Sequence, residues 1–165
     1  MAYNESVATL KQATLLFLVK DDEILLAMKK RGFGVGRWNG VGGKPDANET
    51  TEQTAIRECD EEIVVVPQTL KHVATLDFYF PSDKSDWNQQ VIVYFCTKWQ
   101  GVPTETDEMS PAWYKISNIP YDKMWKDDKY WLPEVLKGRF VKARFQFDNK
   151  DGVLSHKLEV LQQID

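Results

Sequence analysis

Apolar residues gather in short runs separated by polar turns, a pattern typical of β-strands. Five such runs lie at residues 14–19, 23–28, 72–80, 91–97 and 112–116. The first two are joined by residues 20–22, Lys-Asp-Asp, and predict a β-hairpin. Residues 1–12 predict no regular element, and residues 82–89 predict a polar loop.

A first helix is predicted at residues 50–62, where the apolar spacing changes from that of a strand to that of a helix. Thr50 followed by Gln53 three residues later has the form of an N-terminal capping box. Val64 and Val65 then favour a strand or turn, so the helix is expected to end near Glu62.

The C-terminal part predicts a helix and a hairpin. Residues 120–138 have helical character, with Asp127 or Asp128 as the N-cap and Gly138 at the end. Residues 140–147 alternate between apolar and polar positions, and the following turn lets residues 153–161 pair back as a terminal hairpin.

Length and composition fit one globular domain over residues 1–165, of the α+β class, with mostly antiparallel strands covered by two helices. The formal net charge of −4 argues against binding of long nucleic acid or membrane surfaces. The two cysteines have neither metal-site spacing nor a disulfide pattern, which predicts a reducing, cytoplasmic location. No Walker A loop, dinucleotide fingerprint or zinc-protease motif is present.

Candidate chemistry concentrates in a glycine segment and the helix after it. Six glycines fall between Gly32 and Gly43, so the backbone there can approach a ligand closely. On the predicted helix, Glu58, Glu61 and Glu62 stand at i, i+3 and i+4 and share one face. Like charges at that spacing repel, and clustered carboxylates suit Mg²⁺ or Mn²⁺ as the neutralising cation.

Gly43, Glu49, Arg57-Glu58 and Glu61-Glu62 resemble the Nudix box, G-x5-E-x7-R-E-U-x-E-E-x-G-U, where U is aliphatic. Every charged position matches. Cys59 replaces an aliphatic residue, and Val64 replaces the glycine that lets the chain turn in a left-handed conformation. Because a β-branched residue resists that conformation, the turn is expected to be built differently here. The alternative reading is a solvated acidic helix without a metal.

The flanking segments 28–40, 105–109 and 124–131 resemble the animal-type 8-oxo-dGTPases, a branch of the Nudix hydrolases. The resemblance implies an α/β/α sandwich around a mixed β-sheet. It also implies metal-dependent hydrolysis of oxidised purine nucleoside triphosphates, of the 8-oxo-dGTP and 2-hydroxy-dATP type, to a monophosphate and pyrophosphate. The expected partner is a small nucleotide bound by a monomer.

The resemblance also implies roles for individual residues. The metal ligands are expected to be the Gly43 carbonyl, Glu58, Glu61, Glu62 and Glu108. Glu62 is the favoured general base, although the sequence does not separate it from Glu58. Arg57 is expected to orient the carboxylates, with Glu49 as its partner.

A base pocket is suggested by residue type. Asn39 offers a donor and an acceptor, and Asp127 and Asp128 lie near Trp125 and Trp131. Two carboxylates in a poorly hydrated pocket rarely both ionise, so a shared proton would match either an oxo or an amino edge. The alternative is that one aspartate is only an N-cap and the tryptophans are core. By resemblance, the remaining substrate-binding residues are Thr14, Lys29 and Phe33.

Two other classes of function stay open on this sequence. One is a Nudix enzyme acting on a dinucleoside polyphosphate, a nucleotide sugar, a methylated purine nucleotide or a capped RNA end. The other is a Nudix-fold module that binds nucleotides without hydrolysing them, against which the complete glutamate set argues.

Overall fold

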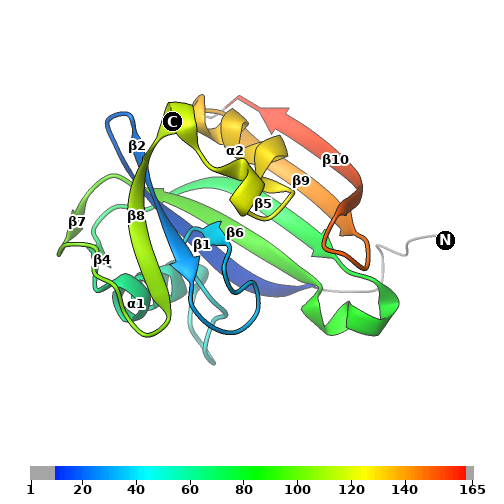
Figure 1. Ribbon diagram of the computed structural model, residues 1–165, viewed down its shortest axis with the longest axis horizontal. Helices are drawn as coiled ribbons and strands as arrows, with labels where there is room; N and C mark the ends of the chain where they lie inside the picture. The colour runs from blue at the N-terminus through cyan, green and yellow to red at the C-terminus, as the bar shows by residue number, and fades with distance from the viewer. Residues whose placement is uncertain (1–9, 163–165) are drawn as a thin grey trace.

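A computed structural model describes residues 10–162, in which eight strands form one mixed sheet (Figure 1). The order is β10-β9-β5-β6-β1-β2-β3, and β8 pairs with β2. The strands are β1 Lys11–Lys20, β2 Glu23–Lys29, β3 Trp38–Asn39, β5 Lys71–Tyr79, β6 Gln89–Cys96, β8 Met109–Lys115, β9 Phe140–Phe147 and β10 Val153–Leu161. A separate two-stranded sheet pairs β4 Val66–Pro67 with β7 Trp99–Gln100.

The strand pairings confirm both predicted hairpins and the mixed character of the sheet. β1 pairs antiparallel with β2, and β9 pairs antiparallel with β10. Two pairs are parallel, β1 with β6 and β5 with β9. The prediction for residues 1–9 lies outside the described residues, whereas Lys11 and Gln12 already belong to β1.

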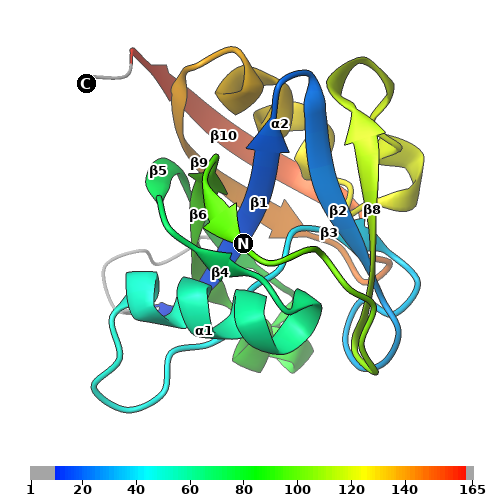
Figure 2. The same cartoon turned by 90° about the vertical axis from the view of Figure 1, so that its left-hand side faces the viewer.

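The two helices cover opposite faces of the sheet, as Figure 2 shows with α1 (Thr51–Ile63) at the bottom and α2 (Asp128–Leu136) at the top. Each face of the sheet carries its own hydrophobic core. β1 contributes to both cores, because successive side chains of a strand point to opposite faces. Phe17 packs on the α2 side with Trp131, whereas Leu16 and Leu18 pack on the α1 side with Cys59. The predicted α/β/α sandwich is therefore confirmed.

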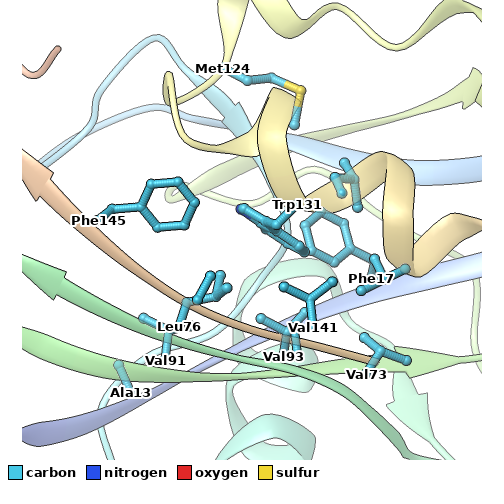
Figure 3. Close-up of a cluster of buried hydrophobic side chains, with 14 of the residues drawn as sticks. Ala13, Phe17, Val73, Leu76, Val91, Val93, Met124, Trp131, Val141 and Phe145 are labelled. Carbon is cyan, nitrogen blue, oxygen red and sulfur yellow. The ribbon is translucent and has the colours of Figure 1, made fainter. Parts of the chain in front are cut away.

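Figure 3 shows the core on the α2 side, where Trp131 projects from the helix towards the strands. The Trp131 and Phe17 rings lie 6.2 Å apart between centroids. Both side chains are fully buried, so this contact anchors α2 on the sheet.

The predicted helix at residues 120–138 is shorter than expected. The α-helix spans only Asp128–Leu136, and a single 3-10 turn, η3 (Tyr121–Lys123), precedes it. Asp127 stands at the N-cap, one of the two predicted positions, but its side chain makes no capping hydrogen bond. The helix ends as predicted, with Gly138 at φ +87°.

Other boundaries also differ from the prediction. β8 begins at Met109, three residues before the expected strand. The polar loop after β5 contains a 3-10 segment, η1 (Ser82–Trp87), and another, η2 (Ile116–Asn118), follows β8. No helix within residues 10–162 is both long and apolar enough to cross a membrane.

The turn after α1 corrects a prediction. Val64 is the C-cap at φ 62° and ψ 40°, so it adopts the left-handed conformation that a glycine would adopt at this place in the box. Its N–H donates to the Asp60 carbonyl at 3.0 Å, and the Thr104 N–H bonds the neighbouring Ile63 carbonyl at 2.9 Å. These contacts hold a β-branched residue in a conformation that costs roughly 1–2 kcal/mol. The capping box at the other end, Thr50 with Gln53, is present as predicted.

Candidate active site

A cavity of about 360 Å³ opens beside the first half of β1 and the ends of β2 and β5. Its lining includes every predicted substrate-binding residue except Trp131, namely Thr14, Lys29, Phe33, Asn39, Trp125, Asp127 and Asp128. Trp131 belongs to the core instead of the pocket wall. The tertiary structure thus brings together residues separated by more than a hundred positions in the chain.

The glycine segment joins this cavity to helix α1. A Cβ on Gly42 would lie 1.9 Å from the Thr14 carbonyl oxygen, and a Cβ on Gly43 would lie 2.5 Å from Glu58 Oε1. At Gly42 only glycine permits the approach, because the neighbour is backbone, whereas at Gly43 a larger residue would displace the Glu58 carboxylate. The Thr14 N–H donates to the Gly43 carbonyl at 2.8 Å, which fixes that carbonyl beside the cavity and the acidic helix face.

Arg57 holds the carboxylates of α1 in place, as predicted. Its Nε and Nη2 donate to Glu49 at 2.8 and 2.9 Å, and its Nη1 donates to Glu58 at 2.9 Å. The same nitrogen lies 3.3 Å from Glu61. The Arg57 hydrogen bonds lower the pKa of Glu49 to about 2. Glu49 is therefore a fixed anion that orients Arg57.

Glu62 differs from the other glutamates because it is buried. Its side chain is 2% exposed, and Oε1 accepts a hydrogen bond from the Gly42 N–H at 3.0 Å. Burial raises the pKa of Glu62 to about 8, with further contributions from Glu58 and Glu108. Burial also raises the pKa of Glu58. At neutral pH a carboxyl with this pKa keeps its proton unless a nearby cation lowers the pKa, so Glu62 can serve as a general base only beside such a cation.

The predicted metal ligands do not form a closed shell. Among residues 10–162, no three His, Cys, Asp or Glu side chains converge on one point. Arg57 contacts Glu58 and Glu61, and Arg31 lies 3.5 Å from Glu108. The donor set nevertheless fits a hard cation, because the buried Glu62 and the partly buried Glu58 are in hydrogen-bonding contact and need a shared proton or a cation.

Asp127 and Asp128 line the cavity and are buried, 3% and 2% exposed. Trp131 Nε1 donates to Asp127 Oδ2 at 2.8 Å, whereas Asp128 Oδ2 has no hydrogen-bond partner. Burial raises the pKa of Asp127 to about 6. Burial, followed by the neighbouring Asp127 charge, raises the pKa of Asp128 well above its ordinary value. The pair is thus suited to hold one proton.

Comparison with known proteins adds the family. The NUDIX domain family matches residues 9–135. This chain belongs to the Nudix family. Oxidized purine nucleoside triphosphate hydrolases from zebrafish and mouse are each 38% identical to it. The zebrafish alignment covers 94% of this chain and 99% of the relative, and the mouse alignment covers 92% and 96%.

The Nudix fold is also seen in solved structures. A MutT protein from Bacillus halodurans superposes with a TM-score of 0.80 at 24% identity, over 91% of this chain and 98% of that chain. A MutT Nudix hydrolase from Burkholderia pseudomallei gives a TM-score of 0.61 over 67% and 86%, at 25% identity. This Nudix hydrolase therefore carries its box on the loop from Gly43 and on α1, and Gly43 lines the open cavity.

Asn39 lies on β3 at the cavity, as the sequence suggested for this Nudix protein. Its Oδ1 accepts a hydrogen bond from the Gly40 N–H at 2.8 Å. That bond fixes the orientation of the amide and makes its NH₂ group the donor available to a ligand.

Aromatic rings form part of the cavity wall. The Phe33 ring lies 5.0 Å from Trp125 and 4.5 Å from Trp87, and the Phe80 and Phe147 rings stack at 4.9 Å. Such rings supply flat apolar area for a planar base.

Sequence reasoning missed Trp87 and Arg37 as pocket residues. Trp87 is the large apolar residue in an otherwise polar loop, and this contrast could have identified it as a residue of the pocket. Arg37 carried no local signal, because its contacts to Trp125 and Asp151 come from distant parts of the chain.

Proposed function

We propose that this Nudix hydrolase acts on oxidised purine nucleoside triphosphates, of the 8-oxo-dGTP and 2-hydroxy-dATP type. The products are the nucleoside monophosphate and pyrophosphate, and the role is removal of damaged nucleotides from the precursor pool. The observation that carries the proposal is the buried Asp127–Asp128 pair, with an unpartnered oxygen, in an aromatic cavity beside the Nudix box.

The base pocket supports a modified purine as the ligand. Asp128 Oδ2 lacks a partner in the protein, and an unmet buried polar atom is costly, so a ligand hydrogen bond at this atom is favoured. A pair that shares one proton presents both a donor and an acceptor. Asn39 adds an NH₂ donor, and Trp125 adds a flat wall. The pair can therefore match purine edges that differ in their oxo and amino groups.

The printed names of the zebrafish and mouse relatives point to the same substrates. Their alignments span nearly the whole chain, so they include both the Nudix box and the pocket segments. The likeness thus supports the substrate class as well as the phosphate chemistry.

In the reaction, water adds to phosphorus and the bond between the α and β phosphates breaks. Glu62 takes the proton of the attacking water in its ionised form, which a bound cation would stabilise against the effect of burial. Arg57 keeps Glu58 and Glu61 oriented through its hydrogen bonds. Lys29 and Lys44 line the cavity and provide positive charge for the phosphates.

A divalent cation, Mg²⁺ or in its place Mn²⁺, would be held by Glu58, Glu61, Glu62, the Gly43 carbonyl and Glu108. When bound, the cation stabilises negative charge on the phosphates and acidifies water. For Glu108 to join these ligands, its carboxylate would have to leave Arg31. That ion pair is exposed and weak, with 3.5 Å between Arg31 Nη2 and Glu108 Oε1. The chain is further proposed to act as a monomer on small nucleotides. Its net negative charge argues against long nucleic acid, and its cysteine content favours a reducing, cytoplasmic location.

A kinetic panel with Mg²⁺ tests the proposal. The substrates are 8-oxo-dGTP, 2-hydroxy-dATP, dGTP, ADP-ribose and a dinucleoside polyphosphate. We expect higher kcat/KM for the two oxidised purines than for dGTP, and release of pyrophosphate. If 8-oxo-dGTP is no better a substrate than dGTP, the proposed substrate class is wrong. Omitting the metal and restoring it with Mg²⁺ or Mn²⁺ tests the cofactor.

A further inference from the structure

Arg37 joins three segments that are far apart in the sequence. Its guanidinium lies over the Trp125 ring, 4.0 Å from the ring centroid. Its Nη2 donates to Asp151 Oδ2 at 3.2 Å in the turn between β9 and β10. Arg37 and Asp151 are both partly buried, with side chains 32% and 28% exposed. A partly desolvated cation over an indole is an attractive contact with defined geometry.

The glycine segment is shaped to bring Arg37 there. The Arg37 N–H bonds the Gly34 carbonyl at 3.1 Å, and the Gly36 N–H bonds the Lys29 carbonyl at 2.8 Å. Gly34 has φ +82°, and a Cβ on it would lie 3.3 Å from Trp125 Nε1. The segment therefore packs directly against the indole, and its backbone bonds fix the position of Arg37.

Arg37 also lies near the acidic pair. It lines the same cavity as Asp127 and Asp128, and its charge lowers the pKa of Asp127 against the larger effect of burial. The other groups that face the pair are Trp131 Nε1 and Tyr121, whose own pKa rises to about 12 through burial and the Asp128 charge. Lys29 and Lys44 line the cavity as well, and Asp151 lies on the far side of Arg37.

We propose that Arg37 is a positioning residue for base recognition, which fixes the Trp125 indole as a pocket wall and keeps a cation beside the Asp127–Asp128 pair. The inference rests on the proposed function, because it assigns the cavity to the base. Asp151 holds the guanidinium in place. Selection among purines then depends on a residue that lies outside the Nudix box.

The test uses the full chain with Arg37→Met, Arg37→Lys and Asp151→Asn. Arg139→Met is the matched control, since Arg139 pairs with Glu134 at an exposed position away from the cavity. For Arg37→Met, we expect KM for the preferred purine triphosphate to rise by about twofold to thirtyfold, while kcat stays within about twofold. Arg37→Lys should restore part of the loss, and Asp151→Asn should cause a smaller rise.

A second measurement separates positioning from folding. Binding of 8-oxo-dGMP without metal is followed against pH by tryptophan fluorescence. The midpoint of the pH dependence should move to higher pH in Arg37→Met and return towards the wild-type value in Arg37→Lys. Unchanged KM and midpoint in Arg37→Met would overturn the proposal. An equal loss for all nucleotides together with a lower melting temperature would also overturn it, in favour of a structural role.

Failure of the proposed function is distinguishable from failure of this inference. Wild-type preference for oxidised purines is measured first and depends on no variant. If the wild type prefers another nucleotide, that nucleotide replaces the probe, and the comparison of Arg37→Met with Arg139→Met is made in the same way.

Discussion

Trp131 Nε1 donates a 2.8 Å hydrogen bond to Asp127 Oδ2, and both residues are almost completely buried. This hydrogen bond connects the core on the α2 side of the sheet to the Asp127–Asp128 pair at the cavity. One face of the indole packs with the α2-side core, while its N–H lowers the pKa of a carboxyl that burial raises.

Trp131→Phe should destabilise the protein more at pH 8 than at pH 4.5. The smaller ring leaves a void at both pH values, but only the ionised Asp127, with a pKa of about 6, needs the lost donor. We expect a total loss of roughly 2–4 kcal/mol at pH 8, measured by denaturant unfolding. Equal losses at the two pH values would mean that the hydrogen bond contributes nothing beyond ring packing.

The acidic pair should make the wild type lose stability as pH rises through about 6. In the folded state the pKa of Asp127 is about 6, above its ordinary value of 3.8, and that of Asp128 is raised further. The folded state therefore binds more protons than the unfolded state over this window, so stability present below about pH 4 is lost as pH increases. Asp128→Asn should lessen this dependence, to which the raised pKa of Glu62 also contributes, and should raise the melting temperature at pH 7.5.

The pH prediction is checked by thermal unfolding at intervals between pH 4 and 8. Asp122→Asn, on the η3 turn, is a matched control, because Asp122 is exposed. The pH curve of the control should follow the wild type. If the melting temperature of the wild type does not change through pH 6, the raised pKa values of the buried Asp127 and Asp128 are contradicted.

Glu62→Gln should abolish turnover while it preserves nucleotide binding. The amide oxygen can still accept the Gly42 N–H, so the local structure persists, but the amide cannot take a proton from water. The expected fall in kcat is about 10²–10⁴-fold, with Kd for a nucleotide changed little. Asp60→Asn serves as the control, because Asp60 is on the same helix but is exposed, whereas Glu62 is buried. Turnover close to the wild-type rate would refute the assignment of Glu62 as the base.

Val64→Gly should stabilise the fold by about 1 kcal/mol, because it removes left-handed strain at φ 62°. Little burial is lost, since the side chain is 49% exposed. Val66→Gly is the matched control: Val66 is also exposed, at 39%, but lies in β4 and should lose roughly 0.5–1 kcal/mol or more. The free energy of unfolding of both variants is measured by chemical denaturation. If Val64→Gly is less stable than the wild type, Val64 is not under backbone strain.

Trp87→Ala should raise KM for purine nucleotides by roughly twofold to tenfold, because one aromatic wall beside Phe33 is lost. kcat should change little, since Trp87 lies on η1 and not on the acidic helix. Trp113→Ala provides a control of similar exposure, 37% against 41%, outside the cavity lining. If the two variants have the same KM, Trp87 does not contact the substrate.

The sequence by itself determined the parts of this protein that depend on local spacing. Apolar runs and alternation predicted the longer strands but not the two-residue strands β3 and β7, and the capping box predicted the start of α1. The i, i+3, i+4 spacing placed Glu58, Glu61 and Glu62 on one helix face, where Arg57 can hold two of them. Such features depend on the period of the backbone and need no knowledge of distant contacts.

Only the tertiary structure decided the features that depend on burial and on contacts between remote segments. It placed Trp131 in the core with its N–H on Asp127, brought Arg37 and Trp87 to the cavity, and held Val64 in a left-handed turn. A side chain's pKa and a backbone's strain depend on everything packed around them. Local sequence does not specify those surroundings, because they are set only when strands far apart in the chain assemble into one sheet.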